Sequence, residues 1–383
     1  MNSNLSKPSG VDWIGDIPRS WNVSRLKDCL EIRNGREVEN QEGLVPVYGS
    51  GGVFGATDKA LFVGDSILFG RKGTIDKPLL VTGEFWTVDT MFYSVLRSQD
   101  SIQYLYYVAS CIDFKSKQSG SALPSMTQTD LGSFYVPRPE PYEQELIASV
   151  LDAETAKIDR AVDLLRQQIK TLEQLKNTII HEAVTKGLDP AAQLMPSAVD
   201  WIGEIPEHWT VSRLKDCLMI FNGREAADES NGDIPVYGSG GAFKWTNDWI
   251  HEGKSILFGR KGTIDRPLLV DGKFWTVDTM FWSIPRRNDD IRYLYYVSKC
   301  LDYKSVQSGS TLPSMTQTAL GGFLIPTPDF EEQIQIADYL DAQVLSFDAA
   351  AALKREQLDL LLQWRSSLIF EYVTGKRRVS EAF

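Results

Sequence analysis

Side chains used for metal binding and nucleophilic catalysis are scarce in this sequence. There are three histidines among 383 residues, and His181, His208 and His251 lie near neither one another nor a cysteine. Neither a metal site nor a histidine-based catalytic triad is therefore indicated. The four cysteines include no C-x-x-C pair, and we expect them to be buried free thiols.

Long apolar runs are missing as well. No stretch reaches the roughly 18 apolar residues that a membrane span requires. The N-terminal segment MNSNLSKPSG also lacks the apolar region of a secretory signal. These absences predict a protein that stays in the cytoplasm.

Nucleotide-binding and methyl-transfer motifs are absent too. GRKGT places its lysine before the glycine, unlike a phosphate loop, and YGSGG lacks the third glycine and the spacing of a dinucleotide fingerprint. The D/N-P-P-Y/F tetrapeptide of amino-methyltransferases does not occur. We therefore expect neither ATP hydrolysis nor methyl transfer by this chain alone, and no cofactor.

The balance of charge is acidic. A total of 51 acidic and 40 basic residues gives a formal net charge of -11. This opposes DNA binding, because phosphate neutralisation requires Lys and Arg on the contacting face. However, GRKGTIDK places Arg71, Lys72 and Lys77 against the single acid Asp76. A basic loop on an acidic frame is compatible with this composition.

What the sequence does contain is one domain twice. Residues 66–96 return at 255–285 with 25 of 31 positions identical and an offset of 189. The similarity extends from WIGDIPRSWNVSRLKDCL, against WIGEIPEHWTVSRLKDCL, to SGSALPSMTQTDLG, against SGSTLPSMTQTALG. A period this long indicates that each copy is a whole domain with its own core. Two near-equal domains imply two near-equal binding events.

Comparison of the copies also bears on the one nuclease-like pattern. Asp271, Gly272 and Lys273 have the D-x-K spacing of some metal-dependent nucleases. The first copy has Thr82 and Glu84 at the outer positions, so the two domains would differ in catalytic competence. Chance is the better explanation.

The repeat divides the chain into segments. We expect a first globular domain at 1–140, a helix at 141–185, a linker at 186–197, a second globular domain at 198–328, and a helix with the C-terminal tail at 329–383. The linker carries Gly187, Pro190 and Pro196, which break helix and allow the chain to turn.

The globular segments predict a mixed α and β fold. SILFG, KPLLV and FWTVDTMFYSVL are rich in β-branched and aromatic residues and are bounded by glycine or proline, which favours short strands. IQYLYYVASCI and IRYLYYVSKCL favour short helices with one aromatic face. Short apolar runs of this kind are ambiguous between strand and buried helix.

A seven-residue spacing of apolar side chains follows each domain and predicts a coiled-coil seam. Its residues are Leu151, Ile158, Leu165, Leu172, Ile179, Leu340, Phe347, Leu361 and Leu368. Ala161 and Leu175 take interleaved positions, Gln168 is a polar exception, and Lys354 stands where the first copy has leucine. Each helix, of about 40 residues, would extend roughly 60 Å.

Such helices either pack on their own domains or pair with each other. The duplication favours pairing, because two matching helices that each follow a globular domain can pair antiparallel and hold the domains apart at a fixed distance.

Candidate binding residues lie in three kinds of loop. FGRKGTID brackets an Arg-Lys pair with glycines, which let a backbone approach a ligand while the side chains reach outward. Arginine can read guanine and lysine can hold a phosphate. KSKQSGSALPSMTQTD carries polar side chains that suit base edges and phosphate oxygens, and PVYGSGG forms a third surface. The alternative is that these are tight or solvated loops without a ligand, while Trp86 and Trp275 favour the core.

The residues singled out on these loops are Tyr48, Ser50, Arg71, Lys72, Thr74, Lys77, Lys115, Gln118, Ser121, Ser125 and Gln128 in the first copy, and Tyr237, Ser239, Arg260, Lys261, Thr263, Arg266, Lys304, Gln307, Ser310, Ser314 and Gln317 in the second.

The chain resembles the DNA-specificity (S) subunit of a Type I restriction-modification system. The resemblance rests on SGVDWIGDIPRSWNVSRLKD and SAVDWIGEIPEHWTVSRLKD at the starts of the copies, and on LPSMTQTDL...VPRPEPYEQELIASVLD, echoed by LPSMTQTAL...IPTPDFEEQIQIADYLD. HEAVTKGLDP and FEYVTGKRR fit the same pattern, so the resemblance covers essentially the whole chain.

This resemblance implies two target recognition domains, each reading one half of a bipartite site in double-stranded DNA. The two conserved helices would act as a spacer and as docking surface for two modification subunits. Adenine methylation and ATP-dependent cleavage would reside in partner modification and restriction subunits, in keeping with the missing catalytic motifs.

The closeness of the copies adds an inference. Recognition domains within one such subunit usually differ, so these two predict nearly identical half-sites, inverted by a pseudo-twofold. Differences concentrate at 37–44 against 225–233 and at 53–65 against 242–254, where the half-sites would diverge.

Two rival hypotheses are also compatible with the sequence. A stand-alone adaptor that joins proteins through its helices predicts no salt-dependent DNA affinity, and an enzyme with unrecognised motifs predicts turnover by the purified chain.

Overall fold

The chain forms two compact units, and each unit contains part of both long helices. The computed structural model describes residues 6–38, 42–119, 124–225, 232–309 and 312–379. The first unit comprises Met1–Arg166 with Glu356–Phe383, and the second comprises Gln167–Arg355. The division therefore falls inside the helices and not where the globular segments end.

The elements of the first globular segment and the helix that follows it are, in order, β1 (Ser6–Pro8), β2 (Asp16–Pro18), β3 (Asn22–Arg25), α1 (Leu26–Cys29), β4 (Leu30–Asn34), β5 (Val45–Gly49), β6 (Gly52–Thr57), β7 (Phe62–Val63), β8 (Ser66–Gly70), β9 (Leu79–Val81), β10 (Glu84–Thr87), β11 (Met91–Leu96), α2 (Ile102–Ala109), a 3-10 turn η1 (Phe114–Lys117), α3 (Gln128–Gly132), β12 (Tyr135–Arg138) and α4 (Pro141–Lys186).

The second copy repeats this order with β13 (Leu194–Pro196), β14 (Glu204–Pro206), β15 (Thr210–Arg213), α5 (Leu214–Cys217), β16 (Leu218–Asn222), β17 (Ile234–Gly238), β18 (Gly241–Thr246), β19 (His251–Glu252), β20 (Ser255–Gly259), β21 (Leu268–Val270), β22 (Lys273–Thr276), β23 (Met280–Pro285), α6 (Ile291–Ser298), a 3-10 turn η2 (Tyr303–Val306), α7 (Gln317–Gly322), β24 (Leu324–Thr327) and α8 (Phe330–Val373). The expected mixed α and β fold is confirmed.

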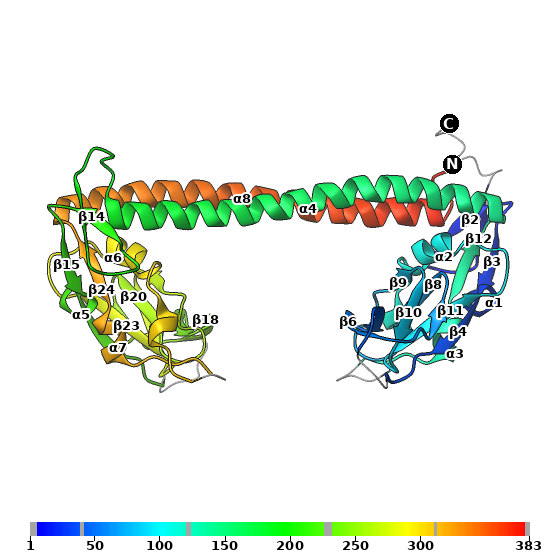
Figure 1. The fold of residues 1–383 in the computed structure, drawn as a ribbon, viewed down its shortest axis with the longest axis horizontal. Coiled ribbons are helices and arrows are strands. Elements are labelled where there is room, and N and C mark those ends of the chain that lie inside the picture. Colours follow the sequence, from blue (N-terminus) through cyan, green and yellow to red (C-terminus); the bar gives the residue numbers. More distant parts are fainter. Residues whose placement is uncertain (1–5, 39–41, 120–123, 226–231, 310–311, 380–383) are drawn as a thin grey trace. The chain divides into compact units, whose positions relative to one another are not determined.

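Two four-stranded sheets form the body of each unit (Figure 1). In the first unit one sheet has the order β4-β11-β8-β9, with antiparallel neighbours. The other has the order β6-β5-β10-β7, in which β5 and β10 are parallel. The second unit repeats both orders, so the two sequence copies fold with the same topology.

Strand β8 shows why the SILFG runs are apolar without alternation. Strands β11 and β9 pair with its two edges, and the side chains of Ile67, Leu68 and Phe69 are at most 1% exposed. A strand buried on both faces needs no polar side. The hydroxyl of Ser66, buried beside them, donates to the carbonyl oxygen of Ser94 at 2.8 Å. Its polar group is thereby satisfied.

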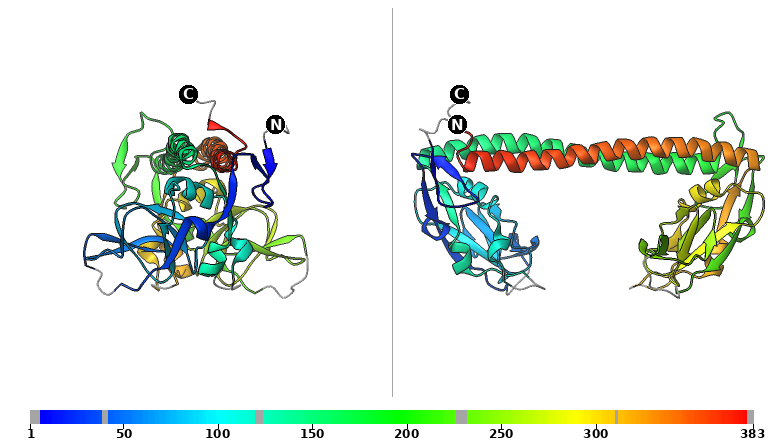
Figure 2. Two further views of the ribbon diagram at one scale, coloured as in Figure 1. Left: turned by 90° about the vertical axis from the view of Figure 1, so that its right-hand side faces the viewer. Right: turned by 180° about the vertical axis from the view of Figure 1, so that it is seen from behind.

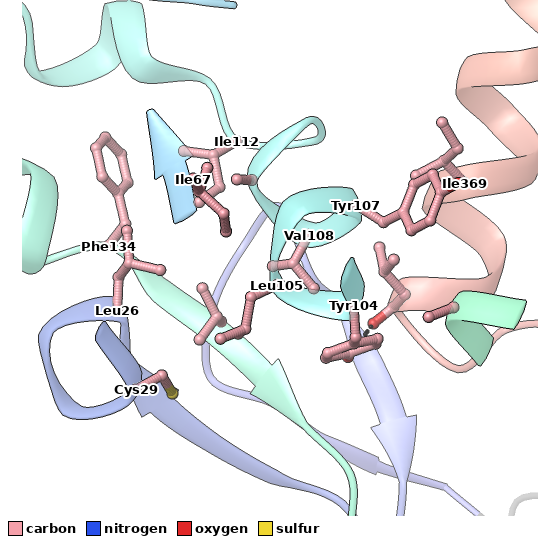
Figure 3. Packing of buried hydrophobic residues seen from close by; sticks show 14 of the residues in the cluster. Leu26, Cys29, Ile67, Tyr104, Leu105, Tyr107, Val108, Ile112, Phe134 and Ile369 are labelled. Atoms are coloured by element: carbon pink, nitrogen blue, oxygen red, sulfur yellow. Dashed lines mark hydrogen bonds between the residues drawn. The ribbon is translucent and has the colours of Figure 1, made fainter. Parts of the chain in front are cut away.

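The core of each unit is closed by the end of a long helix. Figure 3 shows Tyr104, Leu105 and Val108 of α2 buried among side chains from β8, α1 and α8. The Tyr104 hydroxyl lies 3.1 Å from the carbonyl oxygen of Pro137 and 3.2 Å from that of Val373, which ends α8. In the second unit Tyr293 makes the matching contacts, one of them to α4.

Helices α4 and α8 run side by side as an antiparallel coiled coil (Figures 1 and 2). In the first unit the Arg365 guanidinium holds the Asp159 carboxylate through hydrogen bonds of 2.8 and 3.2 Å. In the second unit Lys176 pairs with Asp348 at 2.6 Å. As the residue number rises along α4, its partner's number falls along α8, which fixes the antiparallel direction.

The apolar residues repeated every seven positions are not fully exposed on either helix. Leu151, Ile158, Leu340 and Leu368 are buried, and the remaining members of the seam are partly buried. The interleaved position differs from expectation by one residue. Leu175 is 48% exposed, and its neighbour Lys176 faces the partner helix.

The two polar departures from the seam pattern meet each other. Lys354 donates from its ammonium group to the Gln168 side-chain oxygen at 2.7 Å within the second unit. A buried polar group without a partner is destabilising, whereas a matched pair also favours one register of the helices over another. These residues therefore complement each other and need not interrupt the coiled coil.

The expected linker contains regular structure. Helix α4 ends at Lys186 because Gly187 adopts the left-handed conformation, with φ of 74°, and its amide bonds back to the Ala183 carbonyl oxygen. Strand β13 within the linker pairs antiparallel with β14, as β1 pairs with β2 in the first unit. Residues 194–196 of the expected linker therefore pair with a strand of the second globular segment.

Candidate nucleic-acid interface

The glycine-bracketed basic loop is fixed in shape by its glycines. A Cβ atom on Gly70, at the end of β8, would lie 2.0 Å from the carbonyl oxygen of Thr74, so no other residue fits without moving the backbone. Gly73 has φ of 84°, which favours glycine. The chain turns sharply between these two residues and presents Arg71 and Lys72.

Three loops that are separate in sequence meet at this turn. The Gly73 amide donates to the Pro124 carbonyl oxygen, and the Met126 amide donates to that of Arg71, both at 2.9 Å. Ser125 also pairs with Ser119 through backbone hydrogen bonds of 2.8 and 2.9 Å. A Cβ on Gly73 would lie 3.0 Å from the Ser50 hydroxyl, which places the turn after β5 beside them.

The second unit repeats this arrangement. Gly262 bonds to Pro313, and Met315 bonds to Arg260, again at 2.9 Å. Ser239 lies against Gly262 as Ser50 lies against Gly73. All three loop types singled out in the sequence are therefore brought together twice, although nothing in the sequence places them near one another. We call the paired sites the loop clusters.

The arginine of each loop cluster points inward. The Arg71 guanidinium donates to the Asp89 carbonyl oxygen at 3.2 Å and lies 5.9 Å from the centre of the Phe92 ring. Arg260 makes the same two contacts, with Asp278 and Phe281. Both side chains brace the loop, which differs from the outward-reaching role that the sequence suggested.

The lysines of the loop clusters remain available to a ligand. Lys72 and Lys77 are exposed, as are Lys261 and Arg266. The Lys261 ammonium lies 3.9 Å from the Asp278 carboxylate, a distance that allows only a weak ion pair. These cations supply the local positive charge that the acidic total conceals.

Other candidates are partly engaged within their own unit. Lys115 forms an ion pair of 3.0 Å with Asp76, and this ammonium holds the pKa of the Asp76 carboxyl below its usual value. The side-chain amide of Gln128 donates to the Ile32 carbonyl oxygen at 3.1 Å, and that of Gln317 donates to Ile220 at 2.7 Å. All three side chains are also exposed, so they hold the surface in shape and remain accessible to a ligand.

The remaining candidates divide by exposure. Gln118, Lys304 and Gln307 are exposed, whereas Ser50, Thr74, Ser125, Ser239, Thr263 and Ser314 are partly buried. Tyr48 packs edge-on against Phe85, with ring centres 6.4 Å apart, and Tyr237 packs on the corresponding cluster of the second unit. Ser121 and Ser310 lie outside the described residues.

A pair of exposed phenylalanines was missed in the sequence. Phe54 on β6 is 59% exposed, and its ring lies over Gly49, with one ring atom 3.1 Å from where a Cβ would stand. Phe243 occupies the same position over Gly238. Both follow the loop that carries the cluster serine.

The cysteines have the properties of structural thiols. Cys29 and Cys217 are buried, and burial raises the pKa of all four thiols to about 12. A thiol must ionise to react, so we expect these groups to react slowly at neutral pH. Within the described ranges no three His, Cys, Asp or Glu side chains gather closely enough to hold a metal ion.

We expect iodoacetamide to modify the native thiols far more slowly than the unfolded ones. At about pH 8.5 half of the unfolded cysteines are thiolates, whereas the folded thiols remain protonated. For the same reason the free energy of unfolding falls as pH rises from about 8.5 towards 12, since the unfolded chain loses protons that the folded chain keeps. Mass spectrometry of protein alkylated with and without urea measures the rates at which the thiols are modified. Rapid labelling without urea would contradict the prediction.

None of the described helices is both long enough and apolar enough to cross a membrane. The exposed side chains on α4 and α8 include charged residues throughout, as in Lys157, Arg166 and Arg355.

Comparison with known proteins follows the internal repeat. Residues 18–174 and 206–361 each match the family described as "Type I restriction modification DNA specificity domain". Each match takes in one globular segment and much of the helix that follows it.

Similar proteins match over nearly their whole length. The MjaVIII specificity subunit of a Type I restriction enzyme from Methanocaldococcus jannaschii is 22% identical, with 95% of this chain and 94% of that protein aligned. The MjaIX specificity subunit from the same organism is 24% identical, with 96% of each aligned. A solved structure from a study of the assembly of a Type I restriction-modification system has the same fold, with a TM-score of 0.70 at 16% identity, covering 94% of this chain and 99% of that one.

Proposed function

The chain belongs to the DNA-specificity family of Type I restriction-modification systems, and from this we propose that each of its units reads one half of a bipartite site in double-stranded DNA. The observation that carries the proposal is the loop cluster, in which three polar loops converge with the same hydrogen bonds in both units. A repeated binding surface suits a repeated target. Its relatives are named as specificity subunits, which agrees with a non-catalytic role for this chain.

In this proposal the exposed lysines contact phosphates and the uncharged side chains contact bases. Lys72 and Lys261 stand at the tips of the basic loops and would position the duplex. Ser125 and Gln118 belong to the neighbouring loop and offer both donors and acceptors, which can read base edges. Their counterparts Ser314 and Gln307 would do the same for the second half-site.

The closeness of the two copies supports half-sites of nearly the same sequence. In 66–96 and 255–285, which include the basic loops, 25 of 31 positions are identical. Domains with the same contacting residues read the same bases, so the target would contain a repeated motif with a gap. We propose that the two motifs are inverted, because the helices that would space the units run antiparallel.

The helices would also dock the modification subunits. Apolar side chains that point away from the helix contact are exposed by 48% to 72%. They are Leu164, Leu360 and Trp364 in the first unit and Leu175, Leu345 and Leu353 in the second. Exposed apolar side chains on a helix are favourable once a partner buries them. Adenine methylation and ATP-dependent cleavage would then belong to modification and restriction subunits.

The test is to co-express the chain with candidate modification subunits and to map methylated adenines in the host DNA. A gapped motif with two similar inverted halves is the expected result. A stable complex that methylates nothing, or a purified chain with no salt-dependent affinity for DNA, would contradict the proposal.

We expect Lys72→Ala combined with Lys261→Ala to weaken DNA binding uniformly across sequences. Each lysine that contacts a phosphate changes the slope of log affinity against log salt by about 0.9, so the double variant should lose about 2 from that slope. Fluorescence anisotropy of the assembled complex across a salt series measures it. Lys157→Ala, at an exposed lysine of α4, is the control and should leave the slope unchanged.

A further inference from the structure

The two units differ most plainly on one edge strand. In the second unit β18 is the outermost strand of its sheet, and it carries two exposed rings, Phe243 at a β-bulge and Trp245 two residues later. Trp249 follows in the next turn. The three side chains are 57%, 52% and 48% exposed. We call these three residues the aromatic edge.

The first unit has only one ring on the matching strand. Phe54 corresponds to Phe243, but Ala56 and Ala60 stand where the second unit has its two tryptophans. The topology of the two sheets is the same, so the difference lies in side chains and not in the backbone. The fold therefore does not require the tryptophans.

Charge changes in the same place. Segments 53–65 and 82–84 of the first unit hold three acids and one lysine, whereas 242–254 and 271–273 hold three acids and three lysines. The Lys273 ammonium lies 3.8 Å from the centre of the Trp249 ring, and that of Lys244 lies 5.9 Å from the centre of the Phe243 ring. Aromatic rings interleaved with lysines are typical of nucleic-acid surfaces.

An exposed aromatic edge suits either DNA or a partner protein, and the repeat distinguishes them. If two identical modification subunits dock on the two units, their docking surface is expected to be present on both units. A surface present only on the second unit is therefore not expected to dock these subunits. It can instead contact a DNA sequence that differs between the two halves of the site. Its added positive charge favours the same occupant.

On the basis of the proposed function, we propose that the aromatic edge of the second unit contacts DNA beyond the bases read by the loop clusters. The Phe243 and Trp245 rings contact thymine methyl groups and sugars, and Lys244 and Lys273 contact phosphates. The second half-site is then read over more base pairs than the first, and it contributes the larger share of the affinity.

The test variant gives the second unit the residues of the first. Trp245→Ala with Trp249→Ala copies Ala56 and Ala60, so the fold tolerates the change. The complex assembled with modification subunits is titrated with three duplexes: the intact site, and two in which one half or the other is scrambled. We expect about tenfold weaker binding, as for loss of the burial of one apolar side chain, for the intact site and for only one of the scrambled duplexes.

The other outcomes separate the hypotheses. Unchanged affinity, or equal losses of affinity on both scrambled duplexes, overturns the proposal. Loss of the modification subunits from the complex also overturns it, because that result would assign the aromatic edge to protein docking. Val53→Ala is the matched control, because Val53 is 58% exposed on the first unit's strand and the second unit has Ala242 there. It should bind all three duplexes normally.

A second variant tests the charge without removing a ring. Lys244→Gly with Lys273→Glu restores the first unit's Gly55 and Glu84. This variant should lower the slope of log affinity against log salt by about 2, and an unchanged slope counts against the proposal. If wild-type complex binds the intact site no better than fully scrambled DNA, the proposed function itself fails, whatever the variants do.

Discussion

Replacing Gly70 and Gly259 by alanine is expected to abolish site-specific DNA binding. In each unit the new Cβ would lie 2.0 Å from a carbonyl oxygen four residues later, well inside van der Waals contact. The basic turn must then open, which displaces the lysine and breaks the hydrogen bonds to the neighbouring loop. Affinity should fall to the non-specific level, a loss of about a thousandfold or more.

Gly51→Ala is the control for this pair. Gly51 lies in the adjacent turn between β5 and β6, and a Cβ there meets no atom within 4 Å. It should bind DNA normally. Anisotropy with the mapped site and a scrambled duplex measures both variants, and circular dichroism verifies that they are folded. Normal specificity in the Gly70 and Gly259 variant would show that the basic turn does not contribute to recognition.

Charging the exposed apolar side chains of α8 is expected to release a modification subunit. Leu360→Asp with Trp364→Asp places carboxylates at two apolar positions of the first unit. The Leu360 side chain is 58% exposed and the Trp364 side chain is 51% exposed. Buried aromatic and apolar anchors are each worth about 2 kcal/mol or more at an interface, so the pair should weaken binding roughly a thousandfold. Because both side chains are exposed, the stability of the chain itself should change little.

The measurement is the ratio of subunits that co-purify, determined by native mass spectrometry. Ser366→Asp is the control, since this exposed residue lies on a different side of the same helix. We expect one modification subunit to be lost in the test variant and none in the control. Full retention in both would remove the docking role from this face of the helix.

The repeat and the seven-residue spacing were enough to predict the architecture in outline. Two copies of a mixed α and β domain, each followed by a long helix, follow from periodicity and from duplication. The order of the strands in the sheets could not be predicted in this way. FWTVDTMFYSVL suggested strands, but it forms β10 and β11, which belong to different sheets. Pairing between strands that are distant in sequence determines which sheet each strand joins, and the local spacing of residues does not predict that pairing.

The candidate site was predicted in part, and the limits are physical. The loops with Ser50, Lys72 and Ser125 were recognisable by composition, but their convergence depends on long-range hydrogen bonds. The orientation of Arg71 could not be predicted, because the same side chain can reach outward or lie over a ring such as Phe92. The exposure of Phe54 could not be predicted either, since a phenylalanine in a short strand usually indicates core.

The way the long helices are shared between the units also determines the order in which the protein folds during synthesis. The second unit is one continuous stretch, Gln167–Arg355, whereas the first unit needs Glu356–Phe383, which is made after that stretch. Val373 and Val379 belong to the core that residues near the N-terminus begin. Domains usually complete their folding from the N-terminus onward as the ribosome releases them. Here the unit that is synthesised first completes its core last, after the ribosome has released the end of α8.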